Sequence, residues 1–190
     1  MENMGSSLSE RGIAKEVPAV SATTKGAERL RRLDRRAAVK RLYPVRALHV
    51  VDIENLAGTG TPSLDQVIEV QDCYVTRLGF GADDLVVMAM SHKGLLNAAL
   101  GWPHARYRVR SGRDGADLEL LDVLLHEDVA ARFTHIVIAS GDGVFGQAAR
   151  SLSTRGVWVT VVSRRDSLSP GLALAASDVV YLDGPLNVAA

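Results

Sequence analysis

The chain has 190 residues, of which 47 % are hydrophobic and 23 % are charged, a composition typical of a globular domain and unlike that of a fibre or a disordered chain. No apolar run approaches the roughly 18–20 residues that a membrane-spanning helix needs. The opening segment MENMGSSLSE lacks the apolar core of a secretory signal. The single cysteine, Cys73, excludes an intramolecular disulfide and favours a reducing compartment. Together these features predict a cytoplasmic protein.

The net charge of zero conceals an uneven distribution of charge along the chain. Residues 1–46 contain eleven Lys/Arg and five Asp/Glu, a net charge of +6, whereas residues 47–190 contain eleven and seventeen, a net charge of −6. Residues 1–24 are rich in Ser, Thr, Gly and Ala, and we predict a disordered tail. Residues 25–45 are predicted to form a basic helical arm, because their leucines fall near one helical stripe. Such an arm could bind a polyanion or could simply be a solvated helix.

From residue 46 onward, short apolar segments alternate with helical patterns. RALHVVD (46–52) is apolar nearly throughout, which predicts a strand buried on both faces. Ser63 followed by Gln66 predicts a helix start with a capping box, and Gly79 predicts the end of that helix. The remaining predicted elements are strands at 84–90 and, nearer an edge, 105–110, a helix at 115–130, a strand at 134–140, a helix at 143–155, a strand at 157–162, a helix at 169–176 and a strand at 178–182. This alternation predicts an α/β domain over residues 46–185, with a doubly wound, mostly parallel sheet and helices on both faces, followed by a short tail at 186–190.

Two of the predicted strands end next to acidic residues. The strand at 46–52 ends at Asp52, and the strand at 134–140 ends at Ser140 and is followed by Asp142. Sites in open parallel sheets form beyond the carboxyl ends of the strands, where the strand order reverses. If these two strands are neighbours, the two carboxylates lie side by side. Asp142 could instead merely favour a helix N-terminus, whereas Asp52 is expected to have no local cap to serve.

A third acidic group opens the helix predicted at 115–130. Asp114 and Asp117 are three residues apart and can face the same way on the first turn, although they could instead serve as the N-cap and the capping-box acid. Three carboxylates brought together would raise their pKa values or recruit a divalent cation, and oxygen ligands favour Mg²⁺ or Mn²⁺. Such an ion can bind a phosphodiester oxygen and lower the pKa of a water for attack. Asp122 lies about 140° round the helix from Asp117 and is therefore a weaker candidate.

The segments DIEN (52–55), DGADLELLDVLL (114–125) and IVIASGDGVF (136–145) together resemble the NYN domain, a family of PIN-like ribonucleases, over roughly residues 46–183. The DIEN segment is similar to that of limkain-type NYN proteins. The resemblance implies a PIN-like sheet, an acidic pocket that binds Mg²⁺ or Mn²⁺, and cleavage of RNA. The family's motif residues correspond here to Asp52, Asn55, Asp117, Asp122 and Asp142.

We therefore predict a divalent-metal-dependent ribonuclease, which would be a hydrolase. The predicted catalytic and metal-binding residues are Asp52, Asp117 and Asp142, with Asp114, Asp122 and Glu54 as further candidate ligands. The predicted substrate contacts are Asn55, Ser140, Lys93, Arg110, Arg113 and Arg164, and the strand residues Arg106 and Arg108, together with Arg165, are further candidates for phosphate contacts. RNA is the expected partner and no membrane partner is expected. A homo-oligomer and a protein partner bound through the basic arm are both left open, as is the choice between endonuclease and exonuclease.

Two features favour other functions. Many NYN domains read SGDxDF, but the second acidic position is Val144 here, which favours a catalytically inactive, RNA-binding or regulatory module. GDGVFG (141–146) has the form GxGxxG of a dinucleotide-binding loop. Against that interpretation, Asp142 would repel a pyrophosphate, and the 44 residues after Gly146 are too few for a dinucleotide domain starting there. A haloacid-dehalogenase-type phosphatase would use Asp-x-Asp, whereas Glu54 is the second acid here.

Overall fold

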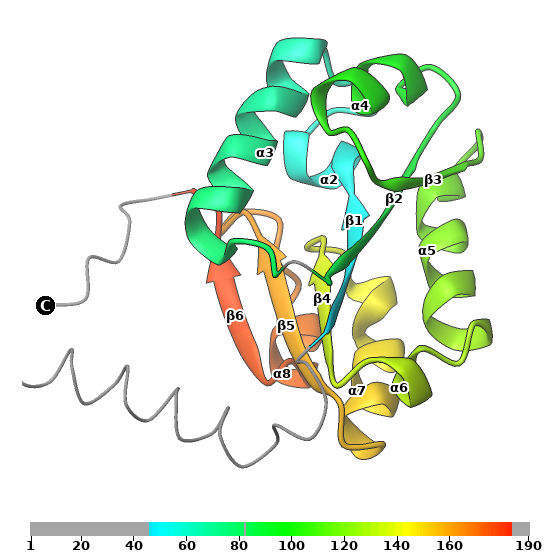
Figure 1. Cartoon of the computed structure of the whole chain (residues 1–190), viewed down its shortest axis with the longest axis vertical. Coiled ribbons are helices and arrows are strands. Elements are labelled where there is room, and N and C mark those ends of the chain that lie inside the picture. The colour runs from blue at the N-terminus through cyan, green and yellow to red at the C-terminus, as the bar shows by residue number, and fades with distance from the viewer. Residues whose placement is uncertain (1–45, 82, 184–190) are drawn as a thin grey trace, which may run out of the picture.

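The computed structural model describes residues 46–81 and 83–183 (Figure 1). The predicted tail at 1–24, the predicted basic arm at 25–45 and the predicted tail at 186–190 lie outside these residues. Within the described part of the chain, six strands form one sheet in the order β3-β2-β1-β4-β5-β6. Each neighbouring pair is parallel. In this part of the chain, no helix combines the length and the apolar composition that crossing a bilayer requires.

The strands are β1 (Ala47–Asp52), β2 (Leu85–Met90), β3 (Arg106–Val109), β4 (His135–Ala139), β5 (Trp158–Ser163) and β6 (Asp178–Tyr181). The central strand β1 is buried along its whole length, as its apolar sequence predicts. The chain builds the sheet outward from β1 through β2 to β3, and then returns to the other side of β1 with β4 and continues to β6. The strand order therefore reverses between β1 and β4, and β3 lies at an edge as predicted.

Helices cover both faces of the sheet (Figure 1). One face packs against α2 (Ile53–Ala57), α3 (Leu64–Leu78) and α4 (Leu95–Gly101). The other packs against α5 (Gly115–His126), α6 (Val129–Arg132), the 3-10 turn η1 (Gly143–Phe145), α7 (Gly146–Thr154) and α8 (Pro170–Ala175). Each face has its own apolar core. The predicted doubly wound, mostly parallel α/β fold is confirmed, and the pairing of the described strands is wholly parallel.

The helices differ from the sequence-based expectation in two ways and agree with it in a third. The helix predicted at 115–130 is two helices, because the chain turns at Asp128, whose φ of 46° lies in the left-handed region. The short helices α2 and α4 were not predicted, since five and seven residues give little helical periodicity. The start of α3 agrees with the prediction, because Ser63 and Gln66 form the capping box and Gly79 ends the helix.

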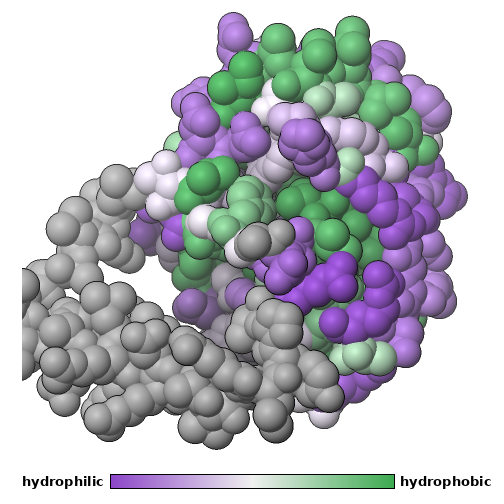
Figure 2. Space-filling model, in the orientation of Figure 1, coloured by the Kyte–Doolittle hydropathy of each residue, from purple (hydrophilic) through white to green (hydrophobic). Residues whose placement is uncertain are grey.

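The outer side of α4 carries exposed apolar side chains. Leu96 and Leu100 are 68 % and 61 % exposed, and Figure 2 shows hydrophobic residues gathered over this helix at the top of the view. The two leucines are four residues apart and therefore share one face of the helix. The helix begins in the loop that leaves the carboxyl end of β2.

Candidate active site

The carboxyl ends of β1 and β4 lie side by side where the strand order reverses. Val51 pairs in register with Ala139, so the next residues, Asp52 and Ser140, are also adjacent. The Ser140 hydroxyl donates a hydrogen bond of 3.2 Å to Oδ2 of Asp52, and Asp52 is only 5 % exposed. The condition on which the placement of these acids depended, that the two strands are neighbours, is therefore met.

Asp52 also begins helix α2. Its Oδ1 accepts a hydrogen bond from the backbone N–H of Asn55 at 3.1 Å, so Asp52 is the N-cap of this helix. The expectation that Asp52 has no local cap to serve is therefore wrong, because the sequence pattern did not reveal a helix of five residues. The Asn55 side chain in turn accepts a hydrogen bond from the Gly141 N–H at 2.9 Å. Asn55 thus holds the loop after β4 against the loop after β1.

Asp142 lies at the exposed rim of the same edge. Its Oδ1 accepts a hydrogen bond from the Val144 N–H at 2.9 Å, which caps η1, and its own N–H donates to the Ser140 hydroxyl at 3.2 Å. The role at a helix start that was the alternative for Asp142 is therefore present. This capping hydrogen bond uses Oδ1, and no hydrogen bond among the described residues uses Oδ2. The cap therefore leaves Oδ2 able to bind a ligand.

The glycine-rich loop after β4 has a packing explanation. A Cβ at Gly141 would lie 2.3 Å from the carbonyl oxygen of Ser167, so only glycine allows the two backbones to approach this closely. The loop also follows β4, whereas the glycine-rich turn of a dinucleotide-binding sheet follows its first strand. Both observations count against the dinucleotide-binding interpretation of GDGVFG.

Asp117 reaches the same edge from the first turn of α5. Partial burial raises its pKa, and repulsion from Asp142 and Asp114 adds to the increase, although a hydrogen bond with Asp52 opposes it. Burial is also the main reason that the pKa of Asp52 is raised to about 7. Hydrogen bonds from Asn55 and Ser140 oppose that shift, while repulsion from Asp117 and Glu54 increases it. Asp117 therefore lies close enough to Asp52 and to Asp142 for charge repulsion with each of them.

Two further predicted ligands border this group. Glu54 accepts a hydrogen bond from the Ser91 N–H at 2.8 Å, which joins α2 to the loop after β2. Sequence analysis missed Ser91, because a backbone N–H contact leaves no signal in the side chain. Asp114 occupies the N-cap position of α5, as considered from the sequence, but its φ is 57° and its side chain makes no capping hydrogen bond. It pairs at 3.7 Å with Arg113.

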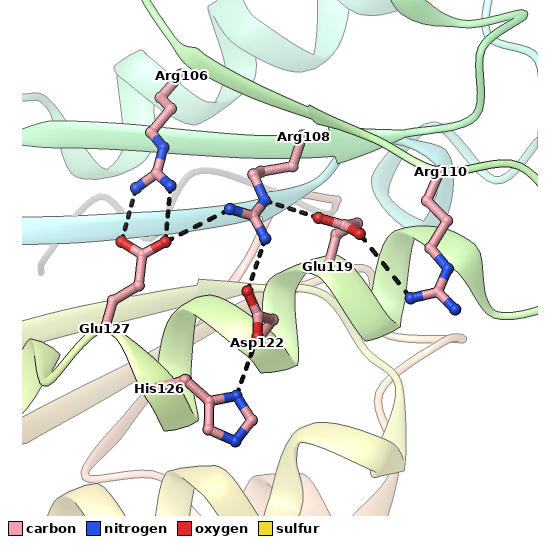
Figure 3. Close-up of polar contacts among 7 residues, drawn as sticks. All are labelled: Arg106, Arg108, Arg110, Glu119, Asp122, His126 and Glu127. Carbon is pink, nitrogen blue, oxygen red and sulfur yellow. Dashed lines mark hydrogen bonds and ion pairs between the residues drawn. The ribbon is translucent and has the colours of Figure 1, made fainter.

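Asp122 belongs to a different group of residues. Its Oδ2 lies 2.7 Å from Arg108 on β3, and its Oδ1 lies 3.0 Å from His126 one turn later on α5 (Figure 3). These contacts hold the opposite side of α5 against the edge strand. The prediction that Asp122 is a candidate metal ligand is not supported by this arrangement, because its carboxylate oxygens already have partners away from the acidic edge.

The arginines of β3 complete this group. Arg106 binds Glu127 through two hydrogen bonds of 2.6 and 2.7 Å, and Arg108 also binds Glu119 at 2.7 Å. The suggestion that these two strand residues contact phosphate is therefore not supported. Arg110 is more exposed and lies 3.9 Å from Glu119, at the end of the group (Figure 3).

The other predicted substrate contacts lie in loops at the carboxyl edge. Lys93 follows β2 and is exposed, and Arg113 is 95 % exposed. Arg164 follows β5, and its side chain is one-third exposed. Its guanidinium group packs on Gly58, in the space that a side chain at that position would need. Its Nε is buried without a hydrogen-bond partner, although Asp166 lies 3.3 Å away as an ion pair.

The acidic group has a donor set that suits a hard divalent cation. Among residues 46–81 and 83–183, no Lys or Arg forms an ion pair with Asp52, Glu54, Asp117 or Asp142. In the same residues, no three His, Cys, Asp or Glu side chains are arranged to hold one metal ion. Mg²⁺ is commonly bound by one or two carboxylates, with water and substrate phosphate as the other ligands. The neighbouring carboxylates of Asp52 and Asp117 fit that simpler arrangement.

Comparison with known proteins adds information about the fold. No protein-family model matches the chain, and no curated protein matches it. Among solved structures, a protein of unknown function from Vibrio parahaemolyticus is similar, with 16 % sequence identity and a TM-score of 0.54 over 73 % of this chain and 93 % of that chain. At this level of identity the similarity concerns the fold alone. Together with the strand order, it shows that the chain adopts a doubly wound α/β fold.

Proposed function

We propose that the protein is a metal-dependent ribonuclease that hydrolyses RNA phosphodiester bonds at the edge formed by Asp52, Asp117 and Asp142. One observation carries the proposal: the carboxylates of Asp52 and Asp117, from two separate elements, are neighbours where the strand order reverses, and Asp142 lies beside Asp117 at the rim. None of them has a Lys or Arg ion-pair partner in the part of the chain that the structure describes. Sites in open parallel sheets form at this point.

The electrostatics of the group favour a bound cation. Two carboxylates about 4 Å apart repel by roughly 4 kcal/mol at an effective dielectric constant of 20. Burial is the main reason that the pKa of Asp52 is raised to about 7, and repulsion from Asp117 and Glu54 adds to the increase. A bound Mg²⁺ or Mn²⁺ would neutralise the carboxylates, hold a phosphodiester oxygen and lower the pKa of an attacking water.

The surrounding side chains support this role by fixing the acidic group in place. Ser140 donates to one oxygen of Asp52 while the Asn55 backbone donates to the other, so the carboxylate cannot rotate freely. Asn55 and Ser140 are therefore positioning residues. The exposed cations Lys93 and Arg113 at the rim are suited to contact the RNA backbone, because phosphate contacts set the register of a bound strand.

The proposal is tested by cleavage of a labelled single-stranded RNA in the presence of Mn²⁺. We expect Asp52→Asn and Asp117→Asn to lower the cleavage rate by at least ~100-fold, because each removes a charge that the cation needs. The matched control is Asp122→Asn, which removes an aspartate from the same helix but from the group paired with Arg108. It should cleave within about threefold of the wild type. An inert wild-type protein would contradict the proposal.

A second candidate function rests on Val144. This residue occupies the position of the second acidic residue of the SGDxDF motif and is 44 % exposed on η1 at the rim. With one carboxylate fewer, the domain could bind RNA without cleaving it. This alternative predicts that the wild type binds RNA and is inert with Mn²⁺, and that Val144→Asp cleaves. Cleavage by the wild type that disappears in Asp52→Asn rules it out.

A further inference from the structure

Arg165 and Tyr181 form a stacked pair beside the acidic edge. The Arg165 guanidinium carbon lies 4.2 Å from the centre of the Tyr181 ring. Tyr181 pairs in register with Ser163 at the carboxyl end of β5, and Arg165 follows that strand by two residues. The Arg165 N–H donates a hydrogen bond of 2.8 Å to Asp183, which anchors the loop. The pair therefore lies at the same edge of the sheet as the three aspartates.

The guanidinium group of Arg165 is not held in place by an ion pair with any of the residues that the structure describes. Among the residues that the structure describes, no carboxylate lies within ion-pair distance of this guanidinium, since Asp183 accepts from the backbone and Asp166 pairs with Arg164. The side chain is exposed. An arginine that is stacked on an aromatic ring and keeps its donors available is a common platform for an unpaired base.

The distance from the acidic group suits a bound strand. Neighbouring strands of a sheet lie about 4.8 Å apart, so β5 is roughly 10 Å and β6 roughly 14 Å from β1. A nucleic-acid strand covers this distance in a few nucleotides. Arg164 lies between the acidic group and the Arg165–Tyr181 pair. Its guanidinium contacts Gly58, which ends the helix that Asp52 begins. Basic side chains thus lead from the acidic group to the Arg165–Tyr181 pair.

We propose that Arg165 stacked on Tyr181 is a subsite for an unpaired base of a single-stranded RNA whose backbone crosses the carboxyl edge of the sheet. The inference rests on the proposed function for the identity of the polymer. It requires a single strand, because the base faces of a duplex are already stacked on one another. It also assigns the β5–β6 side of the edge to the bases, while Lys93 and Arg113 flank the acidic group on the other side.

The test is the binding of a labelled single-stranded RNA of mixed sequence, measured by fluorescence anisotropy in EDTA so that no cleavage occurs. We expect Arg165→Ala and Tyr181→Leu each to weaken binding by about 5- to 100-fold, the range that removal of one base-stacking interaction gives. Arg165→Lys keeps the charge but removes the planar group and should also weaken binding. The control Arg155→Ala removes an exposed arginine paired with Asp128 at the opposite edge, and it should change affinity less than about twofold.

Two further comparisons separate stacking from effects on folding or on charge. Tyr181→Phe keeps the ring and should bind like the wild type, and its thermal midpoint together with that of Tyr181→Leu shows whether the variants fold. Affinity for a duplex of the same sequence should change little in any of these variants. If Arg165→Ala binds like Arg155→Ala, or if Arg165→Lys binds like the wild type, the stacking subsite is overturned while the ribonuclease proposal stands. If the stacking variants lose affinity but the wild type does not cleave with Mn²⁺, the hydrolysis fails and the subsite stands.

Discussion

Asp52 combines a structural role with the chemical role that we propose for it. It caps α2 through one oxygen and accepts from Ser140 through the other, yet burial raises its pKa to about 7. The two hydrogen bonds therefore do not fully compensate for the loss of hydration. A buried, ionised carboxylate lowers the stability of the fold in the absence of a cation. Such a loss of stability is common at functional sites.

We expect Asp52→Asn to be more stable than the wild type at high pH. A carboxyl group whose pKa is raised on folding contributes stability that is present below pH ~4 and is lost as the pH rises through about 7. Asparagine does not ionise, so the gain in free energy of unfolding should grow over that range to roughly 2–4 kcal/mol. Urea unfolding in EDTA between pH 4.5 and 8.5 measures it.

The control for this experiment is Asp72→Asn, because Asp72 is exposed on α3. Its stability should differ little from that of the wild type. A pH-independent destabilisation of Asp52→Asn would show instead that the cap hydrogen bond outweighs the buried charge.

The loops after β1 and β4 hold each other in place at the site. Asn55 bonds the Gly141 N–H, and the loop that follows β5 passes so close that a Cβ at Gly141 would collide with Ser167. Asn55 was predicted as a substrate contact, and the structure shows that its side chain also holds the loop after β4. Rigid loops of this kind are what a cation site needs, because ligands must keep their geometry.

Gly141→Ala should destabilise the protein by about 1–3 kcal/mol, because the added methyl group overlaps the backbone of Ser167. It should also lower the Mn²⁺-dependent rise in thermal midpoint, since Asp142 is the next residue. The matched control is Gly60→Ala, where a Cβ meets nothing within 4 Å. That variant should be neutral or slightly more stable. Equal stability of the two variants would contradict the packing argument.

Helix α5 presents different acids to two different places. Asp117 in its first turn joins the acidic edge, whereas Glu119 and Asp122 pair with Arg108 on β3 (Figure 3). The angle between Asp117 and Asp122 round the helix was enough to rank Asp122 lower from the sequence. Its partners could not be inferred, because they depend on how close β3 lies to the helix.

The parallel sheet brings the acidic group and the Arg165–Tyr181 pair to one edge. Because all six described strands run in the same direction, their carboxyl ends and the loops that follow them share that edge (Figure 1). The reversal between β1 and β4 leaves room there for the acidic group. The arrangement gives acids at the centre, with Lys93 and Arg113 on one side and Arg164 and Arg165 on the other.

The basic segment before β1 should affect RNA binding but not the acidic site. Residues 1–45 carry ten Lys/Arg and five Asp/Glu. Deleting them should weaken RNA binding about tenfold at low salt and make the dependence of log affinity on log salt shallower, by about 0.7 for each phosphate that the segment neutralises. The Mn²⁺-dependent rise in thermal midpoint should not change. An unchanged salt dependence would show that the segment is a solvated part of the chain that does not bind RNA.

Local patterns in the chain were sufficient to predict the strands, the longer helices, the Ser63 capping box and the α/β class, because burial and capping repeat over a few residues. The pairing of Asp52 with Ser140 required the additional assumption that their strands are neighbours. The cap made by Asp52 is a local contact that was missed because a helix of five residues gives little periodicity. Tertiary structure alone decided the ion pair of Asp122 with Arg108 and the stacking of Arg165 on Tyr181. Each of these depends on which strands and helices become neighbours after the crossover connections, and contacts between elements leave no periodic signal in the sequence.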